Sequence, residues 1–355
     1  MTRKVVGLVV LACLAGAPLS ARAAGGKKHG DYVVGISNST YGNLWREKHI
    51  EETVAVANLY IKRGWLKSVV VQQAGPDVAA QIQQIRNMIN QGVDMLLINP
   101  ASATGLTGVI EEAKEAGIPS IVMDAELIGA DRKLALSVAT DKYKEAYNSM
   151  KYVAQAIGGK GKVILLLGIA GDQPTMKRHE GAKAVLKEFP NLELLTTAYA
   201  SYNQSTAESV MNDLISTYPK IDAVFTIGSM GMGVLRAFEK AGRPLPAISG
   251  DPTYEFALYA KAQRDAGKKF IYACPANPPG IGGTAMHVAA YLLNGYTFKD
   301  GVLDDNGYLY PVKSMITPET LDKWLAYFKG QDPSAWISEV AGEDDIQKLF
   351  TPPRS

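Results

Sequence analysis

Polar and aromatic side chains follow several apolar runs of this 355-residue sequence, in positions where they could bind a small molecule. The first group stands in SNSTYGNLWREKH, residues 37–49, where an amide, an indole and a guanidinium come close together. Ligand hydroxyls donate to carboxylates and accept from guanidinium and amide groups, and a sugar ring can stack on Trp or Tyr. The set therefore favours a neutral, polyhydroxylated ligand. Its members are Asn43, Trp45, Arg46, Asn99, Asp124, Arg178, Tyr202, Asp251 and Asn277.

Each of these residues also has a purely structural interpretation. Asp and Asn at strand ends commonly cap the next helix, and Trp45 can be a core aromatic at a helix start. Arg46 can reach a ligand or pair with a nearby acidic residue. The set as a whole is more informative than any single member. Its members follow different apolar runs, yet all of them suit contacts with hydroxyl groups or a sugar ring.

The motifs of common enzyme and cofactor sites are missing. GGKGK, residues 158–162, lacks the spacing of a phosphate-binding loop, and GSMGMG, residues 228–233, is not a dinucleotide-binding G-x-G-x-x-G. There is no G-x-S-x-G nucleophile elbow. The histidines are far apart and lack the i, i+4 spacing of a zinc site. We therefore expect no catalytic residue, no metal and no cofactor.

The apolar runs that precede the candidate residues have the character of parallel strands. They are mostly continuous rather than alternating, which is typical of strands covered by helices on both faces. Stretches with helical spacing lie between them, such as residues 78–90. This alternation predicts an α/β fold with two doubly wound, Rossmann-like lobes. The predicted strands are YVVGIS, SVVVQQ, MLLINP, PSIVMD, KVILLLG, LELLTTA, DAVFTIG, PAISGD and FIYACP.

Residues 1–23 have the pattern of a secretory signal peptide. Basic MTRK precedes the apolar VVGLVVLACLAGAPL, and SARAA ends the segment with small residues. The apolar run is shorter than the roughly 20 residues of a membrane-spanning helix. Removal of residues 1–23 takes away Arg3, Lys4 and Arg22 and no acidic residue, so the formal net charge falls from +2 to −1. The mature chain then has no basic excess to attract nucleic acid, and Cys274 is left without a cysteine partner.

Several short motifs, in their order and spacing, resemble the periplasmic sugar-binding proteins of ABC importers, which have the type I fold, and among them the ribose-binding group. The motifs are LLINP at residues 96–100, GIAG at 168–171 followed by Arg178, IVMD ending at Asp124, and GD at 250–251. DAVFT and GVLRA match as well. The resemblance covers roughly residues 31–311.

The resemblance implies roles for five of the candidate residues. Asn43 matches a ligand-binding asparagine after the first strand, and Trp45 falls where the family has a stacking aromatic. Asp124 and Asp251 match two binding carboxylates, one from each side of a cleft. Arg178 matches an arginine that reaches ligand oxygens.

The pattern departs from the family at several points, so the pocket is expected to differ from a ribose pocket. The arginine expected after the first aspartate is Ala125 here, and Arg46 is a candidate for the missing guanidinium. The asparagine expected after AVF is replaced by TIGSMG. The expected glutamine falls in CPANP, where Asn277 is the nearest polar candidate, and Tyr202 takes the place of an aromatic in the second lobe.

The resemblance also implies how the chain is divided. The N-terminal lobe is expected to comprise residues 31–139 and 276–312, and the C-terminal lobe residues 140–275 and 313–330. Three chain crossings join them as a hinge. Residues 331–355 lie outside the family pattern. Because they are polar and have Pro-Pro near their end, we expect them to form a C-terminal tail that packs loosely over the surface.

The expected function is that of an exported, periplasmic solute-binding protein. A monomer would capture a sugar or polyol in the inter-lobe cleft and deliver it to the membrane permease of an ABC importer. The alternative is a binding protein with the same pocket that reports to a chemoreceptor or sensor kinase. A sugar-responsive repressor would need a DNA-binding module, and an enzyme would need a catalytic motif. The sequence does not identify the sugar or polyol.

Overall fold

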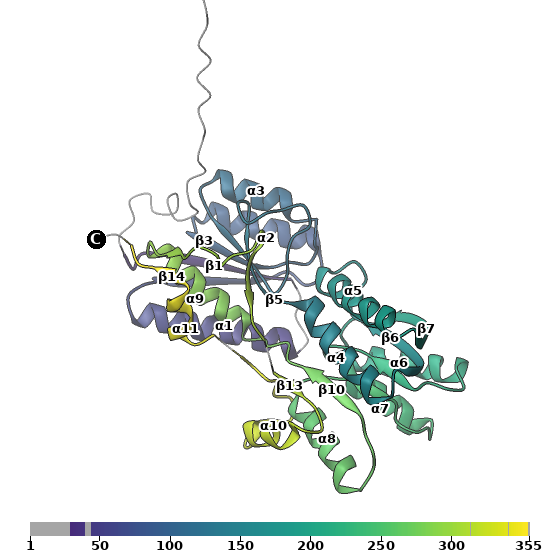
Figure 1. The fold of residues 1–355 in the computed structure, drawn as a ribbon. Coiled ribbons are helices and arrows are strands. Elements are labelled where there is room, and N and C mark those ends of the chain that lie inside the picture. The colour runs from purple at the N-terminus through teal and green to yellow at the C-terminus, as the bar shows by residue number, and fades with distance from the viewer. Residues whose placement is uncertain (1–28, 40–43, 313, 340, 354–355) are drawn as a thin grey trace, which may run out of the picture.

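The computed structural model describes residues 29–39, 44–312, 314–339 and 341–353 of the chain. It has two lobes, each built around one six-stranded sheet (Figure 1). The predicted α/β fold with two doubly wound lobes is therefore confirmed. None of the helices in these described ranges is long and apolar enough to cross a membrane.

The first sheet consists of parallel strands in the order β12-β5-β4-β3-β1-β2. Its strands are β1 (Val33–Asn38), β2 (Ser68–Gln73), β3 (Met95–Asn99), β4 (Ser120–Met123), β5 (Leu136–Thr140) and β12 (Gly307–Tyr310). Its helices are α1 (Leu44–Lys62), α2 (Val78–Asn90), α3 (Thr107–Glu115), α9 (Ile281–Leu293) and α11 (Glu343–Lys348). A two-stranded sheet of β11 (Thr297–Phe298) and β14 (Phe350–Thr351) extends this lobe.

The second sheet has the order β13-β10-β9-β8-β6-β7, and its edge strand β13 runs antiparallel to β10. Its strands are β6 (Lys160–Leu167), β7 (Asn191–Tyr199), β8 (Ala223–Phe225), β9 (Ala247–Ser249), β10 (Tyr272–Pro275) and β13 (Met315–Ile316). Its helices are α4 (Lys142–Ala156), α5 (Gln173–Glu188), α6 (Gln204–Thr217), α7 (Gly231–Lys240), α8 (Tyr254–Asp265) and α10 (Leu321–Phe328). The chain passes between the lobes after β5, after β10 and after β12.

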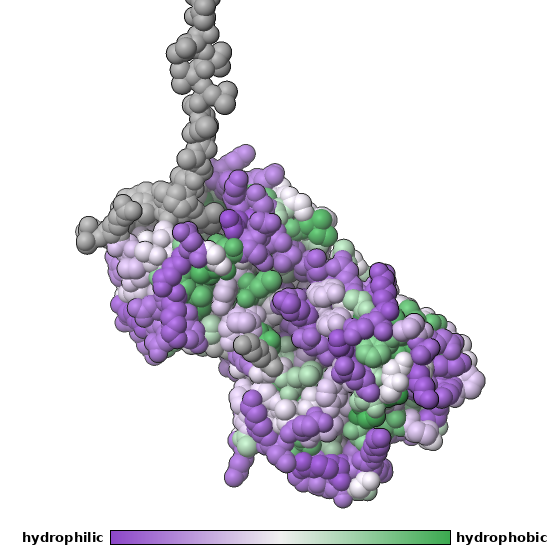
Figure 2. All heavy atoms as spheres, viewed as in Figure 1, coloured by the Kyte–Doolittle hydropathy of each residue, from purple (hydrophilic) through white to green (hydrophobic). Residues whose placement is uncertain are grey.

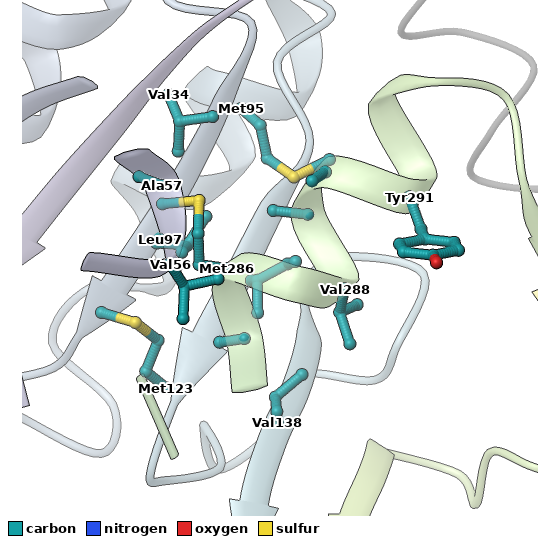
Figure 3. Packing of buried hydrophobic residues seen from close by; sticks show 14 of the residues in the cluster. Val34, Val56, Ala57, Met95, Leu97, Met123, Val138, Met286, Val288 and Tyr291 are labelled. Atoms are coloured by element: carbon teal, nitrogen blue, oxygen red, sulfur yellow. The ribbon is translucent and has the colours of Figure 1, made fainter. Parts of the chain in front are cut away.

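Successive side chains of a strand point to opposite faces of the sheet. In the first sheet both faces carry apolar residues, and helices cover both. On one face Val34 and Leu97 belong to a core that includes Val56 of α1 and Met286 of α9 (Figure 3). On the other face Leu96 belongs to a core that α2 and α3 complete. Every apolar run predicted as a strand forms one. The sequence analysis did not predict β5, β11, β12, β13 and β14. LSVAT of β5 and GYLY of β12 are not continuous apolar runs.

The C-terminal segment contradicts the prediction of a loosely packed tail. Trp336, Ile337, Ile346 and Phe350 are all buried. Helix α11 packs against α9, and β14 pairs with β11. The prediction was wrong because these apolar residues stand in short groups between polar stretches, too short to form the periodic pattern of a full helix or strand.

Candidate functional site

A cavity lies between the two lobes, beyond the carboxyl ends of strands from both sheets. Its volume is about 50 Å³ in this structure, which is smaller than the roughly 300–1,000 Å³ of typical ligand pockets. Helix α1 and the end of β4 contribute from the first lobe, and α5 with the turns after β7 and β8 from the second. The lining residues are Trp45, Arg46, Asp124, Asp172, Pro174, Arg178, Tyr202, Gly228, Ser229, Asn277 and Trp336.

Most of the predicted site residues meet in this wall although they are far apart in the sequence. They are Trp45, Arg46, Asp124, Arg178, Tyr202 and Asn277. Asn43 lies outside the residues that the structure describes. Asn99 and Asp251 are described, but they do not belong to the cavity wall.

Asp124 directly follows β4 and has a left-handed backbone with φ of 62°. Its N–H donates to the Val138 carbonyl at 2.9 Å, which ties the turn to β5. Its carboxylate accepts a 2.6 Å hydrogen bond from Lys142 Nζ. Burial alone would raise the pKa of Asp124, but the charges of Lys142 and Arg46 hold it below its usual value. The carboxylate is therefore ionised and available as an acceptor at neutral pH.

Lys142, the first residue of α4, gathers groups from both lobes where the chain first crosses between them. Besides Asp124, its Nζ donates to Thr140 Oγ1 at 2.6 Å and to Asn277 Oδ1 at 2.7 Å. Only 3% of its side chain is exposed. A buried ammonium needs such partners because desolvation penalises its charge. Lys142 thus fixes the orientation of two cavity residues from behind the wall.

Arg178 on α5 extends the same network into the second lobe. Its Nη2 donates to Glu145 Oε2 at 3.0 Å, and its Nη1 donates to the Tyr202 hydroxyl at 3.2 Å. Burial opposes its charge, but Tyr202 and Glu145 raise the pKa of Arg178 above its ordinary value. Its Nε is buried and has no partner among the described residues. This guanidinium can therefore donate to a ligand oxygen.

Tyr202 packs so closely on the turn after β6 that the neighbouring residue has to be glycine. A Cβ at Gly168 would lie 2.0 Å from the Tyr202 ring, well inside contact distance. The Tyr202 hydroxyl lies 2.7 Å from Thr175 Oγ1 and donates to Asp172 Oδ2 at 3.3 Å. Burial raises the pKa of Tyr202 to about 12, so the hydroxyl keeps its proton.

Trp45 forms an aromatic wall on the first-lobe side. Its Nε1 donates to the Asn277 carbonyl at 2.7 Å, which fixes the indole, and its ring stacks on His49 at 5.0 Å. Burial lowers the pKa of His49 to about 4, so this imidazole is neutral. Its Nδ1 lies 3.0 Å from the Pro279 carbonyl and must donate there. The Arg46 guanidinium carbon lies 5.0 Å from the Trp45 ring centre, within cation–π range.

The charges around the cavity balance. Arg46, Lys142 and Arg178 are cationic, and their acidic neighbours are Asp124, Asp172 and Glu145. Burial is the main reason that the pKa of Arg46 falls and that of Asp172 rises. A charged ligand would leave an unmatched buried charge in such a site, which is costly. The arrangement therefore suits a neutral ligand with many hydroxyls.

Asn99 makes its hydrogen bonds behind the cavity. Its Nδ2 donates to the Met123 carbonyl at 3.2 Å, and its Oδ1 accepts from Ser39 Oγ at 3.2 Å. Gln81 Nε2 donates to the Asn99 carbonyl at 2.9 Å. Asn99 therefore ties the ends of three neighbouring segments together, the structural role that a strand-end amide can also have.

Asp251 accepts two backbone hydrogen bonds at the N-terminus of α7, from Met230 at 3.1 Å and from Gly231 at 2.9 Å. Burial raises the pKa of Asp251 to about 6, although these N–H groups oppose the shift. The carboxylate is thus committed to a helix cap. Anionic side chains are favoured at that position.

The structure also places residues at the site that were not predicted. Asp172 follows β6 in GIAGD, and the rule that selected the other strand-end residues could have found it. Lys142 and Glu145 follow the crossing after β5, so the crossing itself was a signal. Along the sequence Trp336 lies far from every strand end that contributes to the wall, and no local pattern indicates its place.

Comparison with known proteins gives consistent matches. The model of the family described as "Periplasmic binding protein domain" matches residues 34–297. The xylitol-binding protein of Mycolicibacterium smegmatis is 31% identical over 256 residues, 72% of this chain and 70% of that protein. The ribose import binding protein of Bacillus subtilis is 27% identical over 275 residues, 76% of this chain and 84% of that protein.

Solved structures match over a larger share of the chain. An ABC transporter solute binding protein from Thermobispora bispora has a TM-score of 0.78 and 26% identity, covering 90% of this chain and 95% of that one. A solute binding protein from Bacillus halodurans with bound myo-inositol has a TM-score of 0.71 and 23% identity, covering 84% of this chain and 99% of that one. The second of these supports the fold alone.

Proposed function

The chain belongs to the periplasmic binding protein family, and from this we propose that it captures a sugar or polyol between its lobes and delivers it to an ABC importer. The observation that carries the proposal is the balanced set of buried cationic and acidic groups around an aromatic-walled cavity. Two relatives are named for binding xylitol and ribose. Both are neutral, polyhydroxylated molecules of the class that this cavity suits.

The proposed ligand contacts follow from the chemistry of the wall. Asp124 and Asp172 would accept hydrogen bonds from ligand hydroxyls. Arg46, Arg178 and the amide of Asn277 would donate hydrogen bonds to ligand oxygens. The remaining predicted wall residues, Trp45 and Tyr202, offer aromatic surface to the apolar face of a ring. Asn43 remains a predicted contact, and Asn99 and Asp251 are proposed to support the cavity from behind. An unmatched hydroxyl would cost about 1–3 kcal/mol, which gives the site its selectivity.

The proposed mechanism is closure of two lobes around a hinge. The lobes would comprise residues 31–139 with 276–312, and residues 140–275 with 313–330. The three crossings after β5, β10 and β12 would carry the hinge motion. The Lys142 network spans this hinge, so it would hold the cavity residues in place as the lobes approach each other.

The proposed setting is the periplasm, where the protein would work as a monomer, without catalysis, and present its closed form to the membrane permease. Hydrophilic residues cover most of both lobes in the view of Figure 2, and the apolar patches among them are small. This surface gives no support to a large apolar subunit interface on that face. The sensing alternative would use the same cavity and rests on no observation of its own.

A thermal-shift screen of the mature protein against sugars, polyols, amino acids and nucleosides tests the proposal. A ligand at 100 times its Kd stabilises the folded state by about 2.7 kcal/mol, and the melting temperature should rise by several degrees. We expect that rise with a sugar or polyol. A rise with amino acids or nucleosides only would contradict the proposed ligand class.

A further inference from the structure

We propose that Trp336, carried by the C-terminal strap, is a specificity-determining residue of the cavity. The strap is defined as residues 333–339 and 341–351. The proposal rests on the proposed function, because it assigns a further contact in the same site. It concerns a segment that lies outside the matched family region, which ends at residue 297.

The strap is fixed to the second lobe just before and after Trp336. The N–H groups of Tyr254 and Glu255 donate to strap carbonyls at residues 335 and 333, each at 2.8 Å. The strap N–H of Ile337 donates to the Pro252 carbonyl at 2.9 Å, and Trp336 itself forms an antiparallel bridge with Thr253. Backbone hydrogen bonds on both sides leave little freedom to the residue between them.

The anchoring loop is itself held by Asp251. The Thr253 N–H donates to the Asp251 carbonyl at 2.8 Å, while the Asp251 carboxylate caps α7. The position of Trp336 is therefore tied, through this loop, to the end of β9 and the start of α7. Such support is what a binding residue needs if it is to keep one orientation.

Beyond Trp336 the strap reaches the first lobe. The Ala341 N–H donates to Thr284 Oγ1 of α9 at 3.1 Å, and Glu343 forms an ion pair with Arg63, the residue that follows α1. Ile346 and Phe350 are buried in the first-lobe core. The strap is thus a fourth passage between the lobes, additional to the three expected ones. Figure 1 shows it running from beside α10 and β13 to α11.

The Trp336 side chain borders the ligand cavity, and only 6% of the residue is exposed. It shares the wall with Trp45 and Tyr202, which come from the two lobes. An indole is large and rigid, so it both limits the size of the cavity and offers a flat apolar face to a ring. Trp336 would therefore select ligands by the size and shape of their apolar face, while the polar wall selects them by their hydroxyls.

The test compares Trp336→Ala and Trp336→Phe with the unchanged protein. The probes are D-ribose, D-galactose, xylitol, myo-inositol, L-leucine and adenosine, and isothermal titration calorimetry of the full mature chain gives each Kd. Trp336→Ala should weaken binding of the preferred probe at least tenfold, because the cavity loses one of its three aromatic side chains and becomes too wide. Trp336→Phe should recover most of that loss, and the ranking of probes should change between the two variants.

Trp324→Ala is the matched control, because Trp324 is equally buried in the second lobe and does not belong to the cavity wall. It should lower the melting temperature about as much as Trp336→Ala but leave the Kd within about twofold. An unchanged Kd and ranking in Trp336→Ala would overturn the inference. If the unchanged protein binds only leucine or adenosine, the proposed ligand class fails, yet a tenfold loss in Trp336→Ala would still support the role of the strap.

Discussion

Asp124 and Asp251 occupy equivalent places in the two lobes and have different tasks. Each follows the third strand in the order of its sheet, β4 or β9, and each is buried. Asp124 lines the cavity beside Lys142, and its pKa is lowered. Asp251 accepts backbone N–H groups of α7, and burial raises its pKa to about 6. The same strand-end position therefore gives a cavity-lining carboxylate in one lobe and a helix cap in the other.

The start of the helix that follows the neighbouring strand explains the difference. In the second lobe β8 ends at Phe225, and α7 begins at Gly231, close enough for its N–H groups to reach Asp251. In the first lobe β3 ends at Asn99, and α3 begins only at Thr107. Glycine also permits the close approach, since a Cβ at residue 231 would lie 3.3 Å from the Asp251 carboxylate. A short, glycine-rich turn thus takes the carboxylate away from the cavity.

The largest effect should come from removing the cation that Asp124 needs and Asp251 lacks. Lys142→Met leaves Asp124 and Glu145 buried without their ammonium partner, so the free energy of unfolding should fall by about 3–5 kcal/mol. Urea denaturation of the ligand-free protein measures this. Lys144→Met is the control in the same helix, because 71% of its side chain is exposed and its pair with Asp141 is a surface pair. Equal losses in both variants would show that the buried network has no special weight.

A smaller effect is expected on ligand affinity, and it separates the two aspartates directly. Asp124→Asn removes a charged acceptor from the cavity wall, so the Kd for the sugar or polyol found by thermal shift should rise about 100-fold, or about 2.7 kcal/mol. Asp251→Asn should change the Kd by no more than about threefold, because this residue does not belong to the wall. Calorimetric titration of both variants would reverse our assignment if the larger loss occurred at residue 251.

The same comparison shows how far the sequence could predict this protein. Continuous apolar runs predicted the strands and the doubly wound lobes, because burial on both faces of a parallel sheet leaves a strong local pattern. The strand-end rule selected Asp124, which lines the cavity, and Arg178 in the helix after β6 lines it as well. The rule could not tell Asp124 from Asp251, because the deciding hydrogen bonds come from a helix elsewhere in the chain.

Trp336 marks the other limit of prediction from sequence. Its place depends on backbone hydrogen bonds between the strap and the loop after β9, which carry no residue-specific signal. Lys142 could be predicted in part. A buried lysine beside a chain crossing points to a site, but only once the position of the crossing is known. Cavity residues at strand ends could therefore be predicted from the sequence better than residues placed there by chain crossings or by the C-terminal segment.

The pH dependence of stability provides the smallest and most specific test of the two aspartates. The pKa of Asp251 in the folded protein is about 6, above its ordinary value of 3.8. The folded state therefore holds this proton more tightly than the unfolded state, and the resulting stabilisation is complete below pH 4 and is lost as the pH rises through 6. Relative to Asp251→Asn, the unchanged protein should lose on the order of 2 kcal/mol between pH 4 and pH 7.

The contribution of Asp124 to stability should change with pH in the opposite direction, because its pKa in the folded protein lies below the ordinary value. Its contribution is present above pH 4 and is lost only as the pH falls further, so the difference between the unchanged protein and Asp124→Asn should stay level between pH 5 and pH 7. Urea denaturation at several pH values measures both differences under the same conditions. A level difference for Asp251→Asn would mean that this carboxylate stays ionised throughout, and that the N–H groups of Met230 and Gly231 outweigh its burial.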